Sequence, residues 1–172
     1  MDPAEGINYC VRCGQRLERR EIFGALRPVC PACGRIHFVD PKVAVGLLIE
    51  AGRRLLLVRR SQDPQRGKWS IPAGFMDGGE DPQQAARREA REETGLEVYI
   101  TGLQDIYPRG DDGGGADMLL VYKALVTGGE LQPGDDASEA GYFAADSLPE
   151  LAFDSTQAII ARWQQDIDKR SA

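Results

Sequence analysis

The chain has 172 residues, of which 42% are hydrophobic, and it carries a net charge of −6 with a pI of about 4.9. This composition supports one packed domain of ordinary size and a small additional module. It argues against a generic nucleic-acid binder, because such proteins need a basic surface to displace counterions. No apolar run is long enough to span a membrane, and the N-terminus does not resemble a signal peptide, so we expect a cytoplasmic protein.

The four cysteines all lie in the first fifth of the chain. They form two Cys-x2-Cys pairs separated by sixteen residues, and these are Cys10, Cys13, Cys30 and Cys33. This spacing is typical of a zinc site with four thiolate ligands. Gly14 and Gly34 follow the second cysteine of each pair and supply the flexible backbone that a tight metal-binding turn needs. Two disulfides are the alternative, which a reducing cytosol disfavours. We therefore predict a zinc module over residues 1–39.

Residues 40–172 are expected to form a second domain that is rich in strands. Two apolar runs at its start are joined by Ala51-Gly52, which predicts a β-hairpin. The expected strands are 43–49, 55–58, 68–71, 97–107, 118–126 and 139–144. A glycine-rich loop over 74–79 and a loose segment over 110–116 interrupt them.

Two helices complete the expected elements. The first, over 82–94, has Asp81 as its N-cap, Pro82 at its first position and Gly95 at its C-terminal end. The second, over 155–168, has an apolar side made of Ile159, Ile160, Trp163 and Ile167. Strands interleaved with two helices predict an α/β fold in which a mixed sheet lies between helices.

Three glutamates of the first helix form the most informative cluster in the sequence. Glu89, Glu92 and Glu93 are spaced i, i+3 and i+4, so their side chains fall on one helix face. Like charges at this spacing destabilise a helix by roughly a few tenths of a kcal/mol per pair, and Arg88 can balance only part of that. A solvated acidic face is the alternative interpretation.

The other side chains of this helix argue against a solvated acidic face. Its broad polar side is expected to consist of Gln83, Gln84, Arg87, Arg88, Arg91 and Thr94. The three glutamates point to the opposite side, which they share with Ala85, Ala86 and Ala90. Inward carboxylates need a partner, because burial of an unpaired charge is costly. A hard divalent cation such as Mg²⁺, which prefers oxygen ligands, satisfies them best.

The segment 74–96 resembles the Nudix signature at every defined position. Gly74 is followed after five residues by Glu80, and after seven more by the run Arg88-Glu89-Ala90-Arg91-Glu92-Glu93-Thr94-Gly95-Leu96. The cysteine module resembles the N-terminal zinc ribbon of one Nudix subgroup. Three further segments suit this subgroup, namely Asp40-Pro41-Lys42, Trp69-x2-Pro72-Ala73-Gly74-Phe75-Met76 and Leu151-Ala152-Phe153. The resemblance implies a Nudix fold over 40–172, preceded by a zinc ribbon over 1–39.

The resemblance also implies an activity. Nudix hydrolases use Mg²⁺ or Mn²⁺ to cut the pyrophosphate bond of a nucleoside diphosphate derivative. Members of this subgroup hydrolyse FAD and ADP-ribose, so we expect one of these as the substrate and AMP as a product. The expected partner is then a small-molecule nucleotide, without nucleic acid or a membrane, and a homodimer is left open.

The chemistry of phosphoryl transfer assigns expected roles to the signature residues, because metal ions must stabilise the leaving phosphate. The expected magnesium ligands are Glu89, Glu93, a metal- or water-sharing Glu92, and the backbone carbonyl of Gly74 or its neighbour. Arg88 is expected to orient the glutamates, with Glu80 as its partner across the loop. The four cysteines are the expected zinc ligands.

The remaining roles are less constrained by the resemblance. The base that deprotonates the attacking water comes either from the signature helix, where Glu92 is the candidate, or from a later loop. In that later region Glu139 is the best candidate, and Asp111 and Asp112 are others. Side chains with planar groups bind nucleotides through their faces, and the candidates here are Arg59, Trp69, Phe75 and Tyr107. Each of these could equally belong to the core or to the rim of the site.

Other functions are compatible with parts of this sequence pattern. An NADH pyrophosphatase would also have a four-cysteine ribbon, but the Ser-Gln-Pro-Trp type of motif of that branch is absent, since 105–110 reads Asp-Ile-Tyr-Pro-Arg-Gly. A catalytically idle regulator could use the ribbon to read nucleic acid. The intact signature and a ribbon that is near neutral once zinc is bound both disfavour this second alternative.

Overall fold

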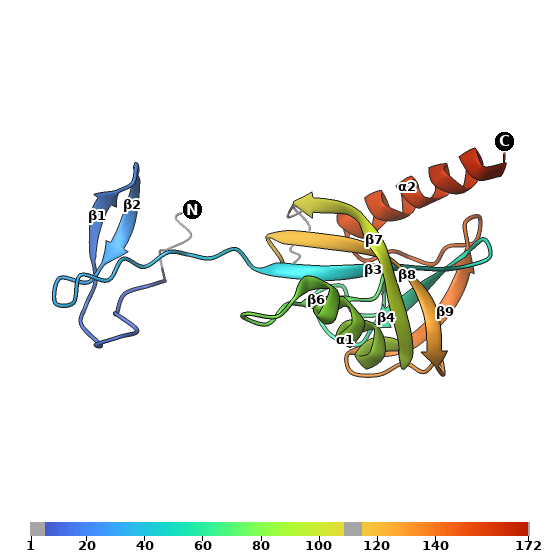
Figure 1. Cartoon of the computed structure of the whole chain (residues 1–172), viewed down its shortest axis with the longest axis horizontal. Coiled ribbons are helices and arrows are strands. Elements are labelled where there is room, and N and C mark those ends of the chain that lie inside the picture. The colour runs from blue at the N-terminus through green and yellow to red at the C-terminus, as the bar shows by residue number, and fades with distance from the viewer. Residues whose placement is uncertain (1–5, 109–114, 172) are drawn as a thin grey trace. The chain divides into compact units, whose positions relative to one another are not determined.

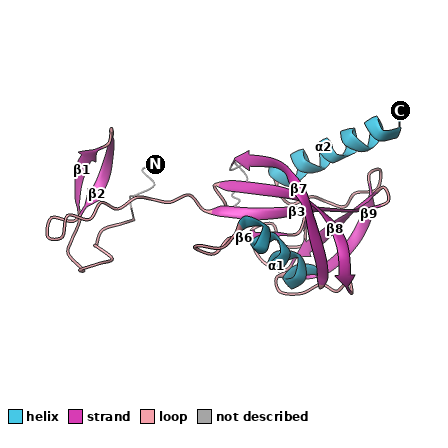
Figure 2. Ribbon diagram, viewed as in Figure 1, coloured by secondary structure: helices cyan, strands magenta, loops and turns pink. Residues whose placement is uncertain are grey.

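The computed structural model describes residues 6–108 and 115–171 of the chain. It divides the chain into two compact units, Met1–Pro41 and Lys42–Ala172. Each unit has its own sheet, and the second also has two helices (Figures 1 and 2). In the described part of the chain, no helix is both long and apolar enough to cross a membrane.

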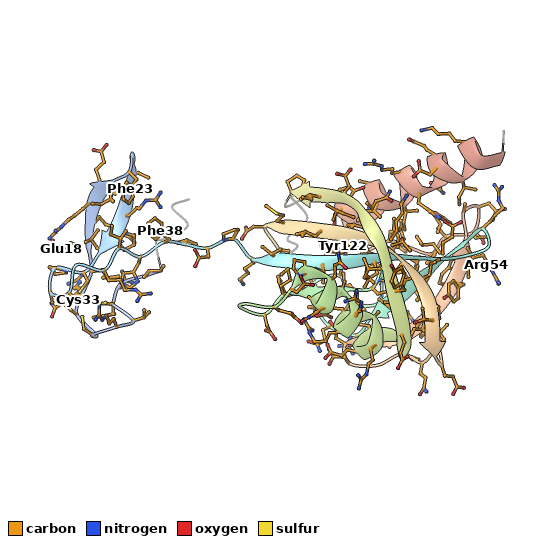
Figure 3. The ribbon with its side chains drawn as sticks, viewed as in Figure 1. Glu18, Phe23, Cys33, Phe38, Arg54 and Tyr122 are labelled. Atoms are coloured by element: carbon orange, nitrogen blue, oxygen red, sulfur yellow. The ribbon has the colours of Figure 1, made fainter. Side chains whose placement is uncertain are left out.

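The first unit is built around a short antiparallel hairpin. Strands β1 (Glu18–Ile22) and β2 (Ala25–Val29) pair along their whole length. Phe23 and Gly24 form the turn and have positive φ values of 53° and 71°, the backbone signature of a two-residue hairpin loop (Figure 3). Isolated bridges, Tyr9 with Arg16 and Val29 with Ile36, attach the neighbouring loops to this hairpin. The sequence analysis did not predict these two strands, because the zinc module was predicted from its cysteine spacing alone.

The second unit contains a seven-stranded sheet in the order β5-β4-β3-β8-β7, with β6 paired to β3 and β9 paired to β4. Its strands are β3 (Val43–Ala51), β4 (Arg54–Arg60), β5 (Trp69–Ser70), β6 (Ala73–Phe75), β7 (Leu96–Pro108), β8 (Met118–Gly129) and β9 (Ala137–Ala144). Strands β3 and β8 are parallel, and the other pairs are antiparallel. The predicted mixed sheet is therefore confirmed.

Helices α1 (Pro82–Thr94) and α2 (Asp154–Ser171) cover opposite faces of this sheet (Figure 1). Side chains alternate between the faces along a strand, so consecutive residues of β3 serve different cores. Leu47 packs on the α1 side and Leu48 on the α2 side. The predicted apolar side of α2, Ile159, Ile160, Trp163 and Ile167, is buried in the second core. The layered α/β architecture is thus confirmed.

Both ends of α1 lie where the sequence predicts them. The Asp81 carboxylate accepts hydrogen bonds from the backbone N–H groups of Gln83 and Gln84, at 3.0 and 3.1 Å. Gly95 ends the helix with a left-handed φ of 69°, a conformation that glycine adopts at little cost. One detail differs, because Thr94 is fully buried and not on the polar side. Its hydroxyl donates to the Ala90 carbonyl, which satisfies it without water.

Two expected irregular segments also differ in part. The predicted glycine-rich loop over 74–79 begins within β6, because Gly74 and Phe75 pair with β3. Of the predicted loose segment over 110–116, residues 110–114 lie outside the described residues. Residues 115 and 116 carry no helix or strand assignment.

Candidate functional site

Two glutamates of α1 are buried against β6. Glu89 and Glu93 are only 6% and 4% exposed, although both carry carboxyl groups. Glu93 accepts a hydrogen bond from the backbone N–H of Ala73 at 2.9 Å. The Glu89 carboxylate lies so close to Gly74 that a Cβ atom on that glycine would be 2.2 Å from it. The inward direction expected for these two side chains is therefore observed.

Arg88 lies among the acidic side chains and contacts three of them. Its guanidinium donates to both oxygens of Glu80, at 2.9 and 3.0 Å, and to Glu89. It also donates to Glu92 at 3.0 Å and to the backbone carbonyl of Phe75 at 2.9 Å. Glu92, with a side chain that is 44% exposed, is at the rim and is not buried like the other two helix glutamates.

The charges in this cluster are only partly balanced. The hydrogen bond from Arg88 is the main cause that lowers the pKa of Glu80 to about 2, so this carboxylate is firmly ionised. Burial raises the pKa of Glu89 and, more strongly, that of Glu93. The Arg88 guanidinium is thus shared among Glu80, Glu89 and Glu92, and a cation beside the buried Glu89 and Glu93 would favour their charged forms.

Asp136 is a residue of this cluster that sequence reasoning passed over. Its carboxyl faces Glu93 and, after burial, raises the pKa of Glu93 further; it also raises that of Glu89. Asp136 lies in the loop between β8 and β9, which is held at two points. The Asp136 carbonyl accepts hydrogen bonds from Ser61, and the Gly134 N–H donates to the Glu93 carbonyl. The Asp136 carboxyl therefore lies against Glu93, and carboxylate oxygens are the ligands that a hard divalent cation such as Mg²⁺ prefers. Among the described residues, only the four cysteines already lie within metal-ligand distance of one another.

The structure does not bring Glu139 to this cluster. Its carboxylate pairs with Arg59 at 2.6 Å, and the two residues are register partners on β9 and β4. Among the described residues, no interaction joins either of them to the glutamates of α1. The other later candidates for the base, Asp111 and Asp112, lie outside the described residues.

The expected nucleotide-binding residues are distributed over different environments. Trp69 belongs to the core on the α2 side, where it packs edge-on against Phe143 with ring centroids 4.7 Å apart. Tyr107 packs against the same core. Phe75 alone of the four lines a cavity beside the acidic cluster. Arg59 does not line this cavity, but its neighbour Arg60 does, because adjacent strand residues point to opposite faces.

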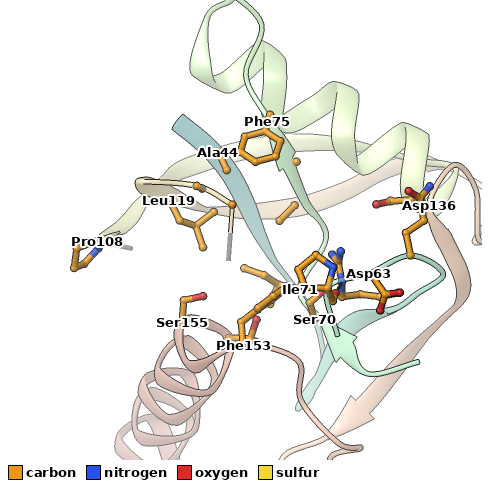
Figure 4. A pocket seen from close by; sticks show the side chains of 18 residues that line it. Ala44, Asp63, Ser70, Ile71, Phe75, Pro108, Leu119, Asp136, Phe153 and Ser155 are labelled. Carbon is orange, nitrogen blue, oxygen red and sulfur yellow. Dashed lines mark hydrogen bonds between the residues drawn. The ribbon is translucent and has the colours of Figure 1, made fainter. Parts of the chain in front are cut away.

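This cavity has a volume of about 300 Å³ and extends from the acidic cluster to the first turn of α2 (Figure 4). Its lining includes Gly74 of β6 and Asp136 beside the acidic cluster, and Ser155 and Thr156 of α2. The Arg60 guanidinium lies 5.0 Å from the centre of the Phe153 ring, and its Nε donates to the Pro64 carbonyl at 2.8 Å. No ion pair joins Arg60 to an acidic residue in the described part of the chain. The cavity therefore offers the positive charge of Arg60 to an anionic ligand.

The four cysteines of the first unit also meet. Their Sγ atoms all lie within 4.8 Å of one another, none is in a disulfide, and Cys10–Cys33 and Cys13–Cys30 are separated by 3.6 and 3.5 Å. Zn–S bonds of about 2.3 Å in a tetrahedron place the sulfurs about 3.8 Å apart, so the cluster fits zinc.

The backbone around the cysteines supports thiolate ligands. Gly14 and Gly34 both have a φ of 72°, and their N–H groups close the turns by donating to the carbonyls of Cys10 and Cys30. The Cys33 N–H donates to Cys30 Sγ and is the main cause that lowers the pKa of Cys30 to about 6. A thiolate that is already favoured at neutral pH is a ready metal ligand.

Similarity to known proteins agrees with this arrangement. A family model described as the NUDIX domain matches residues 40–164. The chain is 39% identical over 130 residues to the ADP-ribose pyrophosphatase of Methanocaldococcus jannaschii, and the match covers 74% of this chain and 77% of that protein. It is 30% identical over 148 residues to the NAD-capped RNA hydrolase NudC of Stutzerimonas stutzeri, covering 83% of this chain but only 50% of the relative.

A solved structure extends this similarity to nearly the whole chain. The crystal structure of a Nudix hydrolase from Nitrosomonas europaea is 30% identical and has a TM-score of 0.84. The match covers 93% of this chain and 92% of that one. By contrast, the chain spans about half the length of the NudC relative.

Proposed function

Because this chain belongs to the Nudix family and is a Nudix hydrolase, we propose that it hydrolyses the pyrophosphate bond of ADP-ribose and releases AMP and ribose 5-phosphate. FAD, the other candidate from the sequence, shares the same AMP half. The observation that carries the proposal is the cluster of Glu89, Glu93 and Asp136, which opens into a cavity that also contains the Arg60 guanidinium. The named activity of the Methanocaldococcus jannaschii relative supports ADP-ribose in particular.

The acidic residues supply the metal site in this proposal. Glu89, Glu93 and Asp136 hold Mg²⁺ or Mn²⁺, with a backbone carbonyl of β6 at Gly74 or its neighbour available as a further oxygen ligand. When bound, the cation polarises a phosphoryl oxygen and lowers the pKa of a water molecule. Arg88 holds Glu89 and Glu92 in position through its own hydrogen bonds and does not contact the substrate.

The hydrolytic step needs a base for the attacking water. The water oxygen forms a bond to one phosphorus, its proton passes to a carboxylate, and the bond to the bridging oxygen breaks, so that the second phosphate leaves. Glu92 at the rim is the carboxylate that we assign to this proton transfer, because Asp136 serves as a metal ligand in the proposal. Glu139 is held by Arg59 on β4 and would first have to give up that pair.

The first unit has a separate role in the proposal. Residues 1–39 are a zinc ribbon whose four cysteines bind Zn²⁺ as a tetrahedral thiolate site. The role of this zinc ion is to stabilise the folded module, because a closed thiolate site releases its metal slowly and its binding free energy contributes directly to folding.

The substrate is tested by measuring AMP release from ADP-ribose, FAD, NADH and dATP at equal Mg²⁺ concentration. We expect kcat/KM for ADP-ribose or FAD to exceed that for NADH or dATP by about tenfold, equivalent to about 1.4 kcal/mol of differential transition-state binding. Release of inorganic pyrophosphate from dATP as the fastest reaction would contradict the proposal.

NADH remains a second candidate because of the similarity to NudC, whose name records action on NAD-capped RNA. The substrate panel separates the two candidates directly. A higher kcat/KM for NADH than for ADP-ribose would replace the first proposal with the second.

A further inference from the structure

A second cavity lies between α2 and the sheet. It has a volume of about 170 Å³ and is lined by side chains of α2 and of the neighbouring strands β3, β8 and β7. Leu48 and Trp163, which belong to the core on the α2 side, are part of its apolar lining. No residue lines both this cavity and the one beside the acidic cluster. The second cavity is therefore separate from the candidate metal site.

Two β-bulges in β7 supply part of the wall of this second cavity. The register of β7 with β8 skips Thr101, and it skips Gln104 three residues later. Both skipped residues line the cavity, and the Thr101 hydroxyl donates to the Lys123 carbonyl of β8 at 3.1 Å. An extra residue in a strand changes the direction of its side chain, and such bulges are frequent beside functional sites. The irregular edge of the sheet thus shapes this cavity.

One side-chain atom of the cavity lining is buried without a hydrogen-bond partner. Among the residues that the structure describes, only His37 Nε2 and Gln104 Oε1 are buried polar side-chain atoms in this state. His37 lies in the first unit, whereas Gln104 lines the cavity. Burial of an unpaired acceptor costs free energy, and a ligand that donates a hydrogen bond recovers it. The cavity therefore favours a ligand with N–H or O–H donors.

The charged groups of the lining favour a cation. They are two carboxylates, Glu50 and Asp166, and the single ammonium group of Lys123. The Glu50 carboxylate accepts a hydrogen bond from the indole N–H of Trp163 at 3.2 Å. Lys123 Nζ lies 4.0 Å from Asp166 Oδ2, which is too long for a direct hydrogen bond. Asp166 can therefore accept a hydrogen bond from a positively charged ligand.

We propose that this cavity binds a primary alkylammonium group, which donates hydrogen bonds to Gln104 Oε1 and to the Asp166 carboxylate while its methylene chain packs against Leu48 and Trp163. An ammonium group has three donors and no acceptor, so it suits an amide oxygen and a carboxylate together. An anionic ligand would instead face two carboxylates and leave the amide oxygen unpaired. The site uses no residue of the acidic cluster, so the proposal is independent of the hydrolytic reaction.

The test is an NMR titration of the full chain with butylammonium, followed through the indole N–H of Trp163 and the backbone amides of β7. The Trp163 signal should shift saturably, and n-butanol should bind at least about tenfold more weakly because it lacks the charge. Gln104→Leu removes the amide oxygen at similar size and should weaken butylammonium binding by roughly fivefold or more. Asp166→Asn should act in the same direction. Both positions are only partly buried, so the variants should fold.

Gln157→Leu is the matched control, because Gln157 is an exposed glutamine of α2 that does not line this cavity. It should leave butylammonium binding unchanged. Putrescine and Nα-acetyllysine amide carry the same group, and the tighter of the two distinguishes a free diamine from a lysine side chain of a partner protein. The proposal would be overturned by an unmoved Trp163 signal, by equal affinity for n-butanol, by tighter binding of butyrate, or by an affinity that neither Gln104→Leu nor Asp166→Asn lowers.

Discussion

The two candidate metal sites of this chain are assembled in opposite ways. The cysteine cluster draws its ligands from two similar turns within a short stretch, each closed by a glycine with a φ of 72°. The carboxylate cluster draws Glu89 and Glu93 from α1 and Asp136 from the loop before β9. The first site can be identified from spacing alone, whereas the second is complete only when α1, β6 and the β9 loop are packed together.

The two sites also differ in what stabilises them without metal. The thiols have no Lys or Arg partner among the hydrogen bonds described, and His37 contacts only Cys10, so a metal ion held by the four thiols would be their main stabilising partner. The acidic cluster has Arg88, which holds three carboxylates through hydrogen bonds. We infer that zinc is needed for folding of the ribbon. The second unit, Lys42–Ala172, which we call the catalytic unit, folds first and binds its metal afterwards.

The largest expected effect follows from removal of the exchangeable metal. Mild EDTA treatment should abolish ADP-ribose hydrolysis and leave the circular dichroism spectrum and melting curve of the catalytic unit essentially unchanged. Addition of Mg²⁺ or Mn²⁺ should restore activity, because a carboxylate site of this kind exchanges freely. Full activity in metal-free buffer would contradict the proposed role of the cluster.

Substitution of one buried carboxylate should have the next largest effect. Glu93→Gln should lower kcat by on the order of 10² or more with a smaller change in KM, because metal ligands act mainly on the transition state. Glu130→Gln is the matched control, since Glu130 is an exposed glutamate. A folded Glu93→Gln protein that keeps more than half of the wild-type kcat would show that Glu93 is not a ligand of the catalytic metal.

A change in the thiolate site should act on stability more than on rate. Cys13→Ser should lower the melting temperature and the soluble yield, because it removes a ligand of a metal that contributes folding free energy. Arg12→Ala keeps all four cysteines and changes only an exposed neighbour, so it should melt like the wild type. An unchanged melting temperature for Cys13→Ser, combined with loss of nucleic-acid binding, would favour the regulator alternative.

The smallest expected effect concerns the ion pair between Glu80 and Arg88. The pKa of Glu80 falls from an ordinary 4.5 to about 2 in the folded protein. A lowered pKa stabilises the fold above pH 4.5, and this contribution is lost as the pH falls from 4.5 toward 2. Urea unfolding should therefore show that Glu80→Gln is less stable than wild type at pH 6, with a smaller difference at pH 3. An equal difference at both pH values would exclude this ion pair as the cause.

Local signals in the sequence were sufficient for several elements. Helix α1 begins after Asp81 and ends at Gly95, as predicted, because both caps depend on residues adjacent to the helix. The cysteine turns were predictable for the same reason. The predicted Nudix fold is confirmed, since its signature occupies one continuous loop and helix.

Features that depend on long-range pairing were not predictable in the same way. Asp136 and Glu139 lie in the same acidic stretch, and only the pairing of β9 with β4 shows that Asp136 reaches α1 while Glu139 meets Arg59. Arg59 and Arg60 are a similar case, because a shift of one residue along a strand exchanges the two faces of the sheet. Periodicity alone does not show which arginine faces the cavity.

The contact between Gly74 and Glu89 limits what position 74 can hold. The Glu89 carboxylate fills the space in which any larger residue at position 74 would place its Cβ atom, 2.2 Å away. Because this carboxylate is the end of a flexible side chain, a substitution at the glycine would displace the carboxylate first and leave the helix in place. A Gly74→Ala protein should therefore keep its fold while its candidate metal ligand points elsewhere. The glycine acts in this sense as a spacer for the acid next to it.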